Sequence, residues 1–156
     1  MSEALAIRRG RGAADRDYVR DLGKRSATSS VSAMRTARHA DVLLSFERLV
    51  DFCFGRAHDV LIAEVEGEPA GFLVLLYDVP DEVTLGAQAF VAYTAVEPHA
   101  RRRGVGRALL AEAERCARGA GSPYISLMVT EDNVPARTLY EQAGFATERR
   151  MMTKPL

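Results

Sequence analysis

The sequence has little cysteine, no excess of either charge and no long apolar run, and each shortage excludes a class of protein. Cys53 and Cys116 lie far apart, with no CxxC pair and no histidine cluster nearby, so the chain predicts neither a metal site nor a disulfide framework, and both cysteines are interpreted as small core residues. The 21 basic residues balance 21 acidic ones, which leaves no overall positive field for nucleic acid or an anionic membrane. The longest apolar stretch, Phe72 to Tyr77, is far shorter than the roughly 20 residues of a membrane-spanning helix.

The remaining composition is typical of one globular domain covering residues 1–156. Hydrophobic residues make up 47% and charged residues 27% of the chain. The first residues lack the long apolar core and small-residue cleavage site of a secretory signal, which favours a cytoplasmic location. Intrinsic disorder is excluded as the main state, because a chain of this size and composition can bury a substantial core.

Apolar spacing predicts an α/β fold in which strands and helices alternate irregularly. Strands are expected over 5–7, 60–65, 70–77, 89–96, 124–129 and 146–153, and helices over 13–22, 41–55, 105–119 and 133–144. This order favours a mixed (α+β) sheet with helices on both faces. The strand over 70–77 is apolar on both faces, so we place it in the middle of the sheet.

The segment from Gly23 to Ala40 is rich in small polar residues and predicts a long mobile loop. Loops of this length in compact domains are commonly binding segments, although a partly ordered helix around residues 31–38 is an equal alternative. Asp41 is the expected N-cap of the helix that follows.

A glycine-arginine segment lies where a strand ends and a helix begins. It reads Arg101-Arg102-Arg103-Gly104-Val105-Gly106-Arg107. Free amides and the positive end of the helix dipole meet at such a place and bind phosphate, and glycines let the phosphate approach the backbone. A tight turn with a solvated basic run is an equally good interpretation from spacing alone. A dinucleotide fingerprint is excluded, because Leu109 stands where its third glycine is needed, and no GxxxxGK[ST] segment exists.

Two motifs in order resemble the GCN5-related N-acetyltransferase (GNAT) family. Arg101 to Gly106 is similar to the family's acetyl-coenzyme A loop, [Q/R]-x-x-G-x-[G/A], and Thr94 to Pro98 resembles the strand that enters it. Asn133 to Phe145 is similar to a second signature, N-x-x-A-x-x-L-Y-x-x-x-G-F. The resemblance implies a GNAT-like fold and transfer of acetyl from acetyl-CoA to a primary amine of a small molecule or peptide, by direct attack in a ternary complex.

The resemblance also implies roles for individual residues. Backbone groups of Thr94 and Val96 would pair with the pantetheine arm, in a wedge opened between their strand and the strand ending near Val129. The Thr94 amide would polarise the thioester carbonyl. The loop would hold the pyrophosphate through residues that all belong to the glycine-arginine segment: Arg101, Arg102, Arg103, Gly104, Val105, Gly106 and Arg107.

The second motif supplies the expected acid. The resemblance makes Tyr140 the general acid for the departing thiolate and Asn133 a cofactor contact; the alternatives are a packing aromatic and a helix cap. Several family members carry a glutamate base early on the strand, but this chain has Phe90 there. Glu97, Glu82, Asp81 and His99 are nearby in sequence, and catalysis through ordered water needs none of them.

The sequence also suggests contacts with the acceptor substrate and with a second copy of the chain. Arg35 and Arg38 are candidate contacts for an anionic part of the acceptor, because the resembling family lines its amine side with the first two helices and their connection. An exposed sheet edge at the carboxyl end favours a homodimer. A non-catalytic acyl-CoA-binding or sensing module of the same fold is the main alternative to an enzyme. A nucleic-acid binder built on the arginine run is disfavoured by the zero net charge.

Overall fold

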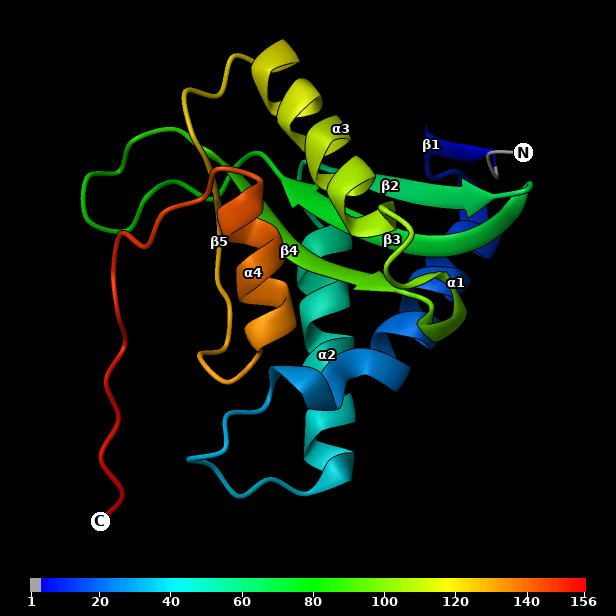
Figure 1. Cartoon of the computed structure of the whole chain (residues 1–156). Helices are drawn as coiled ribbons and strands as arrows, with labels where there is room; N and C mark the ends of the chain where they lie inside the picture. The colour runs from blue at the N-terminus through cyan, green and yellow to red at the C-terminus, as the bar shows by residue number, and fades with distance from the viewer. Residues whose placement is uncertain (1–3) are drawn as a thin grey trace.

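A five-stranded mixed sheet forms the centre of the structure, a computed structural model that describes residues 4–156 (Figure 1). The strands lie in the order β1-β2-β3-β4-β5, with β1 to β4 antiparallel to their neighbours and β5 parallel to β4. Their bounds are β1 Leu5–Arg9, β2 His58–Val65, β3 Glu68–Leu76, β4 Ala89–Val96 and β5 Ile125–Leu127. The expected mixed sheet is therefore confirmed.

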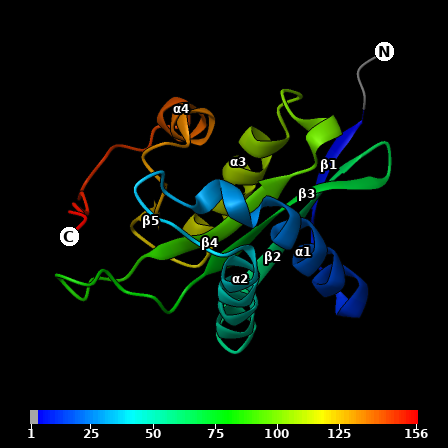
Figure 2. The ribbon, with the colours of Figure 1, turned by 90° about the horizontal axis from the view of Figure 1, so that it is seen from below.

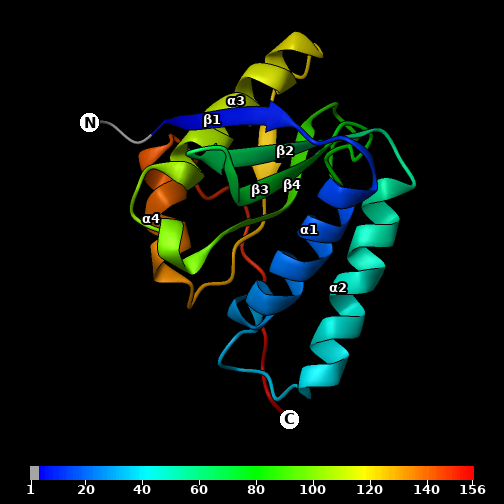
Figure 3. The same cartoon turned by 90° about the vertical axis from the view of Figure 1, so that its right-hand side faces the viewer.

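Four α-helices cover the two faces of the sheet. Helices α1 (Gly12–Ser26) and α2 (His39–Phe54) lie on one face, and α3 (Val105–Gly119) and α4 (Val134–Gln142) lie on the other (Figures 2 and 3). Two short 3₁₀ helices, η1 (Ala27–Ser30) and η2 (Pro98–Ala100), follow α1 and β4. No helix within residues 4–156 is both long and apolar enough to cross a lipid bilayer.

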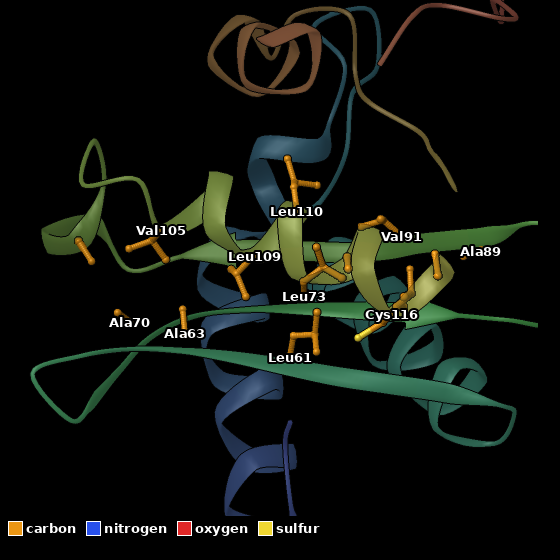
Figure 4. Close-up of a cluster of buried hydrophobic side chains, with 14 residues drawn as sticks. Leu61, Ala63, Ala70, Leu73, Ala89, Val91, Val105, Leu109, Leu110 and Cys116 are labelled. Carbon is orange, nitrogen blue, oxygen red and sulfur yellow. The ribbon is translucent and has the colours of Figure 1, made fainter. Parts of the chain in front are cut away.

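Alternating apolar side chains of β2 and β3 build a core on each side of the sheet. Leu61 and Leu73 point toward α3 and pack in one cluster with Leu109 (Figure 4). Leu75 belongs to the same cluster. Ile62, Phe72 and Val74 point the other way, into a cluster with residues of α1 and α2. Strand β3 is buried on both faces, which confirms its central position. Cys53 and Cys116 are free and buried, one on each side, as small core residues.

A glycine lets α1 and α2 approach each other closely. A Cβ atom at Gly23 would lie 1.9 Å from Cζ of Phe46, so the Phe46 ring occupies the space that any other residue would fill. The same ring meets Tyr93 of β4 edge-on, with the ring centroids 5.0 Å apart. This packing fixes α2 beside the outer half of β4.

The segment predicted as a long loop is more ordered than expected. Helix α1 continues past Leu22 to Ser26, because the Ser26 hydroxyl donates to the Leu22 carbonyl at 3.0 Å and the buried Ala27 begins η1. No helix forms over residues 31–38, so that alternative is wrong. Asp41 is not the N-cap: α2 begins at His39 after Arg38, and the Asp41 carboxylate instead accepts a hydrogen bond from the Arg38 side chain.

The strand expected over residues 146–153 is absent. Residues 145–156 form neither helix nor strand, and Figure 1 shows them as an extended trace leading away from the sheet. An ion pair between Arg149 and Asp81 holds the start of this segment to the β3–β4 loop rather than to β5. The strand predicted over 124–129 is shorter than expected, because β5 pairs with β4 only at Ile125–Leu127. The segment does not pair with β5, whose outer edge has no strand partner within residues 4–156.

Candidate active site

Strands β4 and β5 separate after a short paired stretch. Ala89–Val91 pairs in parallel with Ile125–Leu127, and within residues 4–156 no pairing continues beyond this point. On the other edge of β4, the register against β3 shifts after Val91 so that Ala92 has no partner, which is a β-bulge. A bulge bends its strand and increases the local twist. The separation of these two strands that the resemblance implies is thus seen in the structure.

The outer half of β4 directs two backbone amides toward the opened edge. The Glu97 N–H donates to the Ala70 carbonyl at 2.8 Å, so the Glu97 backbone faces β3. Backbone groups of successive strand residues face opposite edges in turn. The amides of Thr94 and Val96 therefore face away from β3, toward the side that β5 has left. The Thr94 hydroxyl donates to the Phe72 carbonyl at 2.8 Å, which leaves its amide as the group available there.

Helix α3 begins with an open set of amides next to this edge. Gly104 precedes the helix with a left-handed φ of 78°, and a Cβ atom there would meet nothing within 4 Å. No side chain caps the helix. The Ala108 N–H donates to the Gly104 carbonyl at 2.9 Å, and the amides that come before Ala108 in the first turn have no carbonyl acceptor within the α-helix. The arginines of the expected phosphate loop are exposed around this turn: Arg101, Arg102, Arg103 and Arg107.

Gly106 lies where three elements of the structure pack closely. A Cβ atom at Gly106 would lie 2.9 Å from Cδ2 of Leu139 and 3.9 Å from Cγ2 of Val96. The absence of a side chain therefore lets α3, α4 and β4 meet at one point. This contact brings the two sequence motifs together, and it places the residue after Leu139, Tyr140, close to the end of β4.

Asn133 and Tyr140 lie at the two ends of α4. The Asn133 side chain accepts a hydrogen bond from the Ala136 N–H at 3.3 Å, so its role as a helix cap is confirmed. The Tyr140 ring packs edge-on against Phe145, with centroids 6.0 Å apart. Burial raises the pKa of Tyr140 above its ordinary value, and the electrostatic influence of Tyr93 raises it further. Tyr140 is therefore a protonated phenol at neutral pH, on the α4 side of the opened strand edge.

Two carboxylates near β4 in sequence, Glu97 and Asp81, are engaged in ion pairs. Both guanidinium nitrogens of Arg25 donate to Glu97, at 2.8 and 3.0 Å, and lower the pKa of that carboxyl. Hydrogen bonds from Thr84, together with the Arg149 guanidinium, lower the pKa of Asp81 to about 2. Neither group is suited to accept a proton near neutral pH. Phe90, at the position of the glutamate in other family members, pairs with Ser126 of β5.

The Arg25–Glu97 pair should make a measurable, pH-dependent contribution to stability. Replacing Arg25 by methionine should lower the free energy of unfolding at pH 7 by about 1 kcal/mol, because Arg25 is half exposed and solvent screens the pair. The folded-state pKa of Glu97 is lowered, so this stabilisation is complete above the unfolded pKa and is lost as pH falls through the folded one. Urea unfolding should show the two proteins converging below about pH 4.

A second group of residues, between α2 and β4, lines an open cavity of about 340 Å³. Its walls come from η1, the loop after it, α2 and β4, and its lining residues are Ala27, Ser30, Val31, Ala37, Asp41, Val42, Ser45, Phe46, Leu49 and Tyr93. Sequence reasoning expected an acceptor segment here but missed Tyr93, Phe46 and Leu49. The position of Tyr93, next to Thr94 in the motif strand, was the available signal.

The structure does not place Arg35 or Arg38 on the wall of this cavity. Arg38 is 85% exposed and its side chain pairs with Asp41 at 2.8 Å. Arg35 is exposed, and its backbone N–H donates to the Ser32 carbonyl. The anion-binding role expected of these two arginines therefore has no support in the geometry.

The sheet with its separated strands, the uncapped helix after β4 and the half-buried Tyr140 agree with the fold of the GNAT acyltransferases. The family model of the GNAT acetyltransferases matches residues 29–145, and the chain belongs to this family. A curated acetyltransferase of Pectobacterium atrosepticum is 36% identical over 87 residues, which are 56% of this chain and 57% of that relative. The match thus spans about half the length of that curated relative.

Solved structures of acetyltransferases share the whole fold. A protein of Pyrococcus furiosus described as an acetyl transferase matches with a TM-score of 0.82 and 26% identity, over 98% of this chain and all of that one. An aminoglycoside N-acetyltransferase in complex with CoA matches with a TM-score of 0.70 and 18% identity, over 100% and 97% of the two chains. A ribosomal-protein-alanine N-acetyltransferase of Brucella melitensis gives a TM-score of 0.70 at 21% identity, over 98% and 99%. The aminoglycoside and the ribosomal-protein-alanine N-acetyltransferases share the fold of this chain, and at these identities the comparison shows the fold alone.

Proposed function

We propose that this protein transfers an acetyl group from acetyl-CoA to a primary amine by direct attack in a ternary complex. The contact of Gly106 with Leu139 and Val96 is the observation that carries the proposal, because it joins the α3 amides, the opened edge of β4 and Tyr140 in one place. Family membership supports the same reaction class.

The residues present fit the two polar parts of acetyl-CoA. Pyrophosphate needs donors and positive charge, and the first-turn amides of α3 offer donors beside Gly104, where the backbone is unobstructed. Exposed guanidinium groups of Arg101, Arg102, Arg103 and Arg107 would add charge around it. The pantetheine arm carries amide groups, which the backbone of Thr94 and Val96 would pair as a neighbouring strand does. Asn133 would contact the cofactor at the start of α4.

The chemistry needs little from the protein beyond positioning and one proton. Acetyl-CoA would supply a thioester carbonyl at which the neutral amine forms a C–N bond while the C–S bond breaks. The Thr94 amide would donate to the carbonyl oxygen as negative charge develops there. Tyr140 would give its proton to the departing sulfur. The substrate ammonium first loses one proton to water and becomes the neutral amine, and the nitrogen loses a second proton to water after the C–N bond has formed. One of these two protons restores Tyr140, so no dedicated carboxylate base is required.

Acetyl-CoA should raise the melting temperature of the protein. A ligand that binds only the folded state adds about 2.7 kcal/mol to stability when present at 100 times its Kd. Differential scanning fluorimetry with acetyl-CoA, CoA and, as a control, NAD should show shifts for the first two alone. An equal shift with NAD, or none with CoA, would contradict the assignment of the α3 turn. Binding of acetyl-CoA without thiol release to any amine would indicate the non-catalytic module instead.

We further propose that the active protein is a homodimer in which a second copy covers the β5 edge. That edge has no strand partner within residues 4–156, and an unpaired edge is prone to pair with another chain. Large apolar side chains are exposed on and near it and on the segment after α4: Tyr124, Met128, Met151 and Met152. Such a concentration is typical of an interaction surface.

Light scattering after size exclusion should report twice the mass of the chain for the native protein and a single mass for a variant ending at Phe145. The variant keeps every helix and strand of the fold, so its circular dichroism spectrum should be unchanged. A native protein that stays monomeric at micromolar concentration would show that this edge is not an interface, and a truncated protein that stays dimeric would show that residues 146–156 take no part in it.

A further inference from the structure

The cavity between α2 and β4 is suited to one chemical class of acceptor. Its volume of about 340 Å³ falls in the range of small-molecule sites, roughly 300–1,000 Å³. Six of its lining residues are apolar, namely Ala27, Val31, Ala37, Val42, Phe46 and Leu49. The walls therefore favour a ligand with an apolar body, because burial of such a body removes apolar surface from water on both sides.

Charge is sparse among the lining residues. Asp41 is the only one with a charged side chain, and its carboxylate is half exposed and already paired with Arg38. The other polar groups are the hydroxyls of Ser30, Ser45 and Tyr93. A polycation would lose the hydration of several ammonium groups and find one shared carboxylate in return. A carboxylate ligand would meet no cation on the wall and would be repelled by Asp41.

Tyr93 joins this cavity to the opened edge of β4. Its ring is held between Phe46, edge-on at 5.0 Å, and Phe72, stacked at 6.1 Å, and its hydroxyl lies 3.3 Å from the Ser26 hydroxyl. The next residue, Thr94, directs its amide to the opened edge, and the phenol of Tyr93 acts electrostatically on Tyr140. An amine placed beside Tyr93 would thus reach the reacting groups while its body lies against α2.

We propose that the acceptor is a primary amine attached to an apolar or aromatic body with no other charged group, and that Val42 and Leu49 select for that body. The inference rests on the proposed acetyltransferase function and adds the substrate class to it. Helix geometry sets the scale of the ligand: Asp41 and Leu49 are eight residues apart, which corresponds to roughly 12 Å along α2. A six-membered ring with a two-carbon amine arm fits within that length.

Steady-state thiol release from acetyl-CoA tests the proposal with four acceptors: 2-phenylethylamine, hexylamine, spermidine and glutamate. We expect kcat/KM for the two apolar amines to exceed that for spermidine and glutamate at least about tenfold, the discrimination typical of an apolar pocket. In the Leu49→Gln variant, KM for 2-phenylethylamine should rise about tenfold while KM for acetyl-CoA stays unchanged, because a buried amide without partners opposes the apolar ligand.

Two further variants keep the test independent of folding. Val42→Thr keeps the branched shape of the side chain and replaces one methyl group by a hydroxyl, so it should raise KM for the apolar amines in a protein that folds normally. Leu44→Gln is the matched control: Leu44 is on the same helix, 50% exposed and outside the lining, and its KM values should equal those of the native protein.

The outcomes separate this inference from the proposed function. Release with spermidine or glutamate at a kcat/KM equal to or above that of the apolar amines would overturn the substrate class and leave the acetyltransferase function standing. KM values unchanged in both Leu49→Gln and Val42→Thr would likewise overturn the assignment of the cavity. If acetyl-CoA binds but none of the four acceptors supports thiol release, both the proposed function and this inference are overturned.

Discussion

Replacing Tyr140 by phenylalanine should lower kcat about 100-fold or more while leaving the Kd for CoA nearly unchanged. The substitution removes only the hydroxyl, and a positioned general acid contributes roughly 10²- to 10⁴-fold to a rate. The ring would keep its edge-on contact with Phe145, so α4 should stay in place. Stopped-flow or steady-state thiol release gives kcat, and isothermal titration with CoA gives the Kd.

Tyr124→Phe is the matched control, because Tyr124 is 72% exposed and outside the site. Its kcat should equal that of the native protein. The pH profile supplies a second readout: burial keeps the pKa of Tyr140 above its ordinary value of about 10, so the native kcat should show no descending limb below about pH 10. Full turnover in Tyr140→Phe under conditions where chemistry limits the rate would leave Tyr140 as a packing residue.

Replacing Gly104 by aspartate should weaken CoA binding at least about 100-fold without unfolding the protein. Aspartate tolerates the left-handed backbone of Gly104 better than most residues and is a favourable N-cap, so the free energy of unfolding should stay within about 1 kcal/mol of the native value. The new carboxylate would accept from the first-turn amides and repel the pyrophosphate. About 2.8 kcal/mol of lost binding energy corresponds to a factor of 100.

Two variants separate charge from backbone strain in this experiment. Gly104→Asn has the same shape without the charge and should weaken CoA binding less than Gly104→Asp. Gly12→Asp introduces aspartate at another glycine with positive φ and open surroundings, at the start of α1, and should leave binding unchanged. Gly106 is a poorer choice, because a side chain there would displace Leu139 and disturb α4 directly. A folded Gly104→Asp protein with native affinity would exclude the α3 turn as the pyrophosphate site.

The mixed sheet and the positions of most elements along the chain could be predicted because they depend on local pattern. The apolar stretch of β3 indicates a strand covered on both faces, and Asn133 with Pro135 indicates the start of α4. The segment over 146–153 shows the limit of that reasoning. Local sequence can suggest a strand, but pairing depends on where the rest of the chain holds the segment, and Arg149 pairs with Asp81 in the β3–β4 loop while residues 145–156 form no strand.

The site was predictable only where a motif fixes the backbone. Thr94, Gly104 and Tyr140 could be placed from the two motifs, whereas the acceptor cavity is assembled from segments that the sequence leaves unrelated. Tyr93 and Leu49 are 44 residues apart and meet because the Phe46 ring lies against Gly23 and brings α2 to β4. Arg35 and Arg38 were predicted to contact an anionic part of the acceptor because of their charge, but their side chains are exposed and lie outside the cavity lining.

The most direct test of the proposed reaction is to measure both products of a single incubation with acetyl-CoA and 2-phenylethylamine. Thiol titration counts the CoA released, and mass spectrometry counts the amine that has gained one acetyl group. The proposed function predicts that the two amounts are equal at every time point and that both fall about 100-fold or more in Tyr140→Phe. CoA released without an equal amount of acetylated amine would contradict direct transfer to the amine.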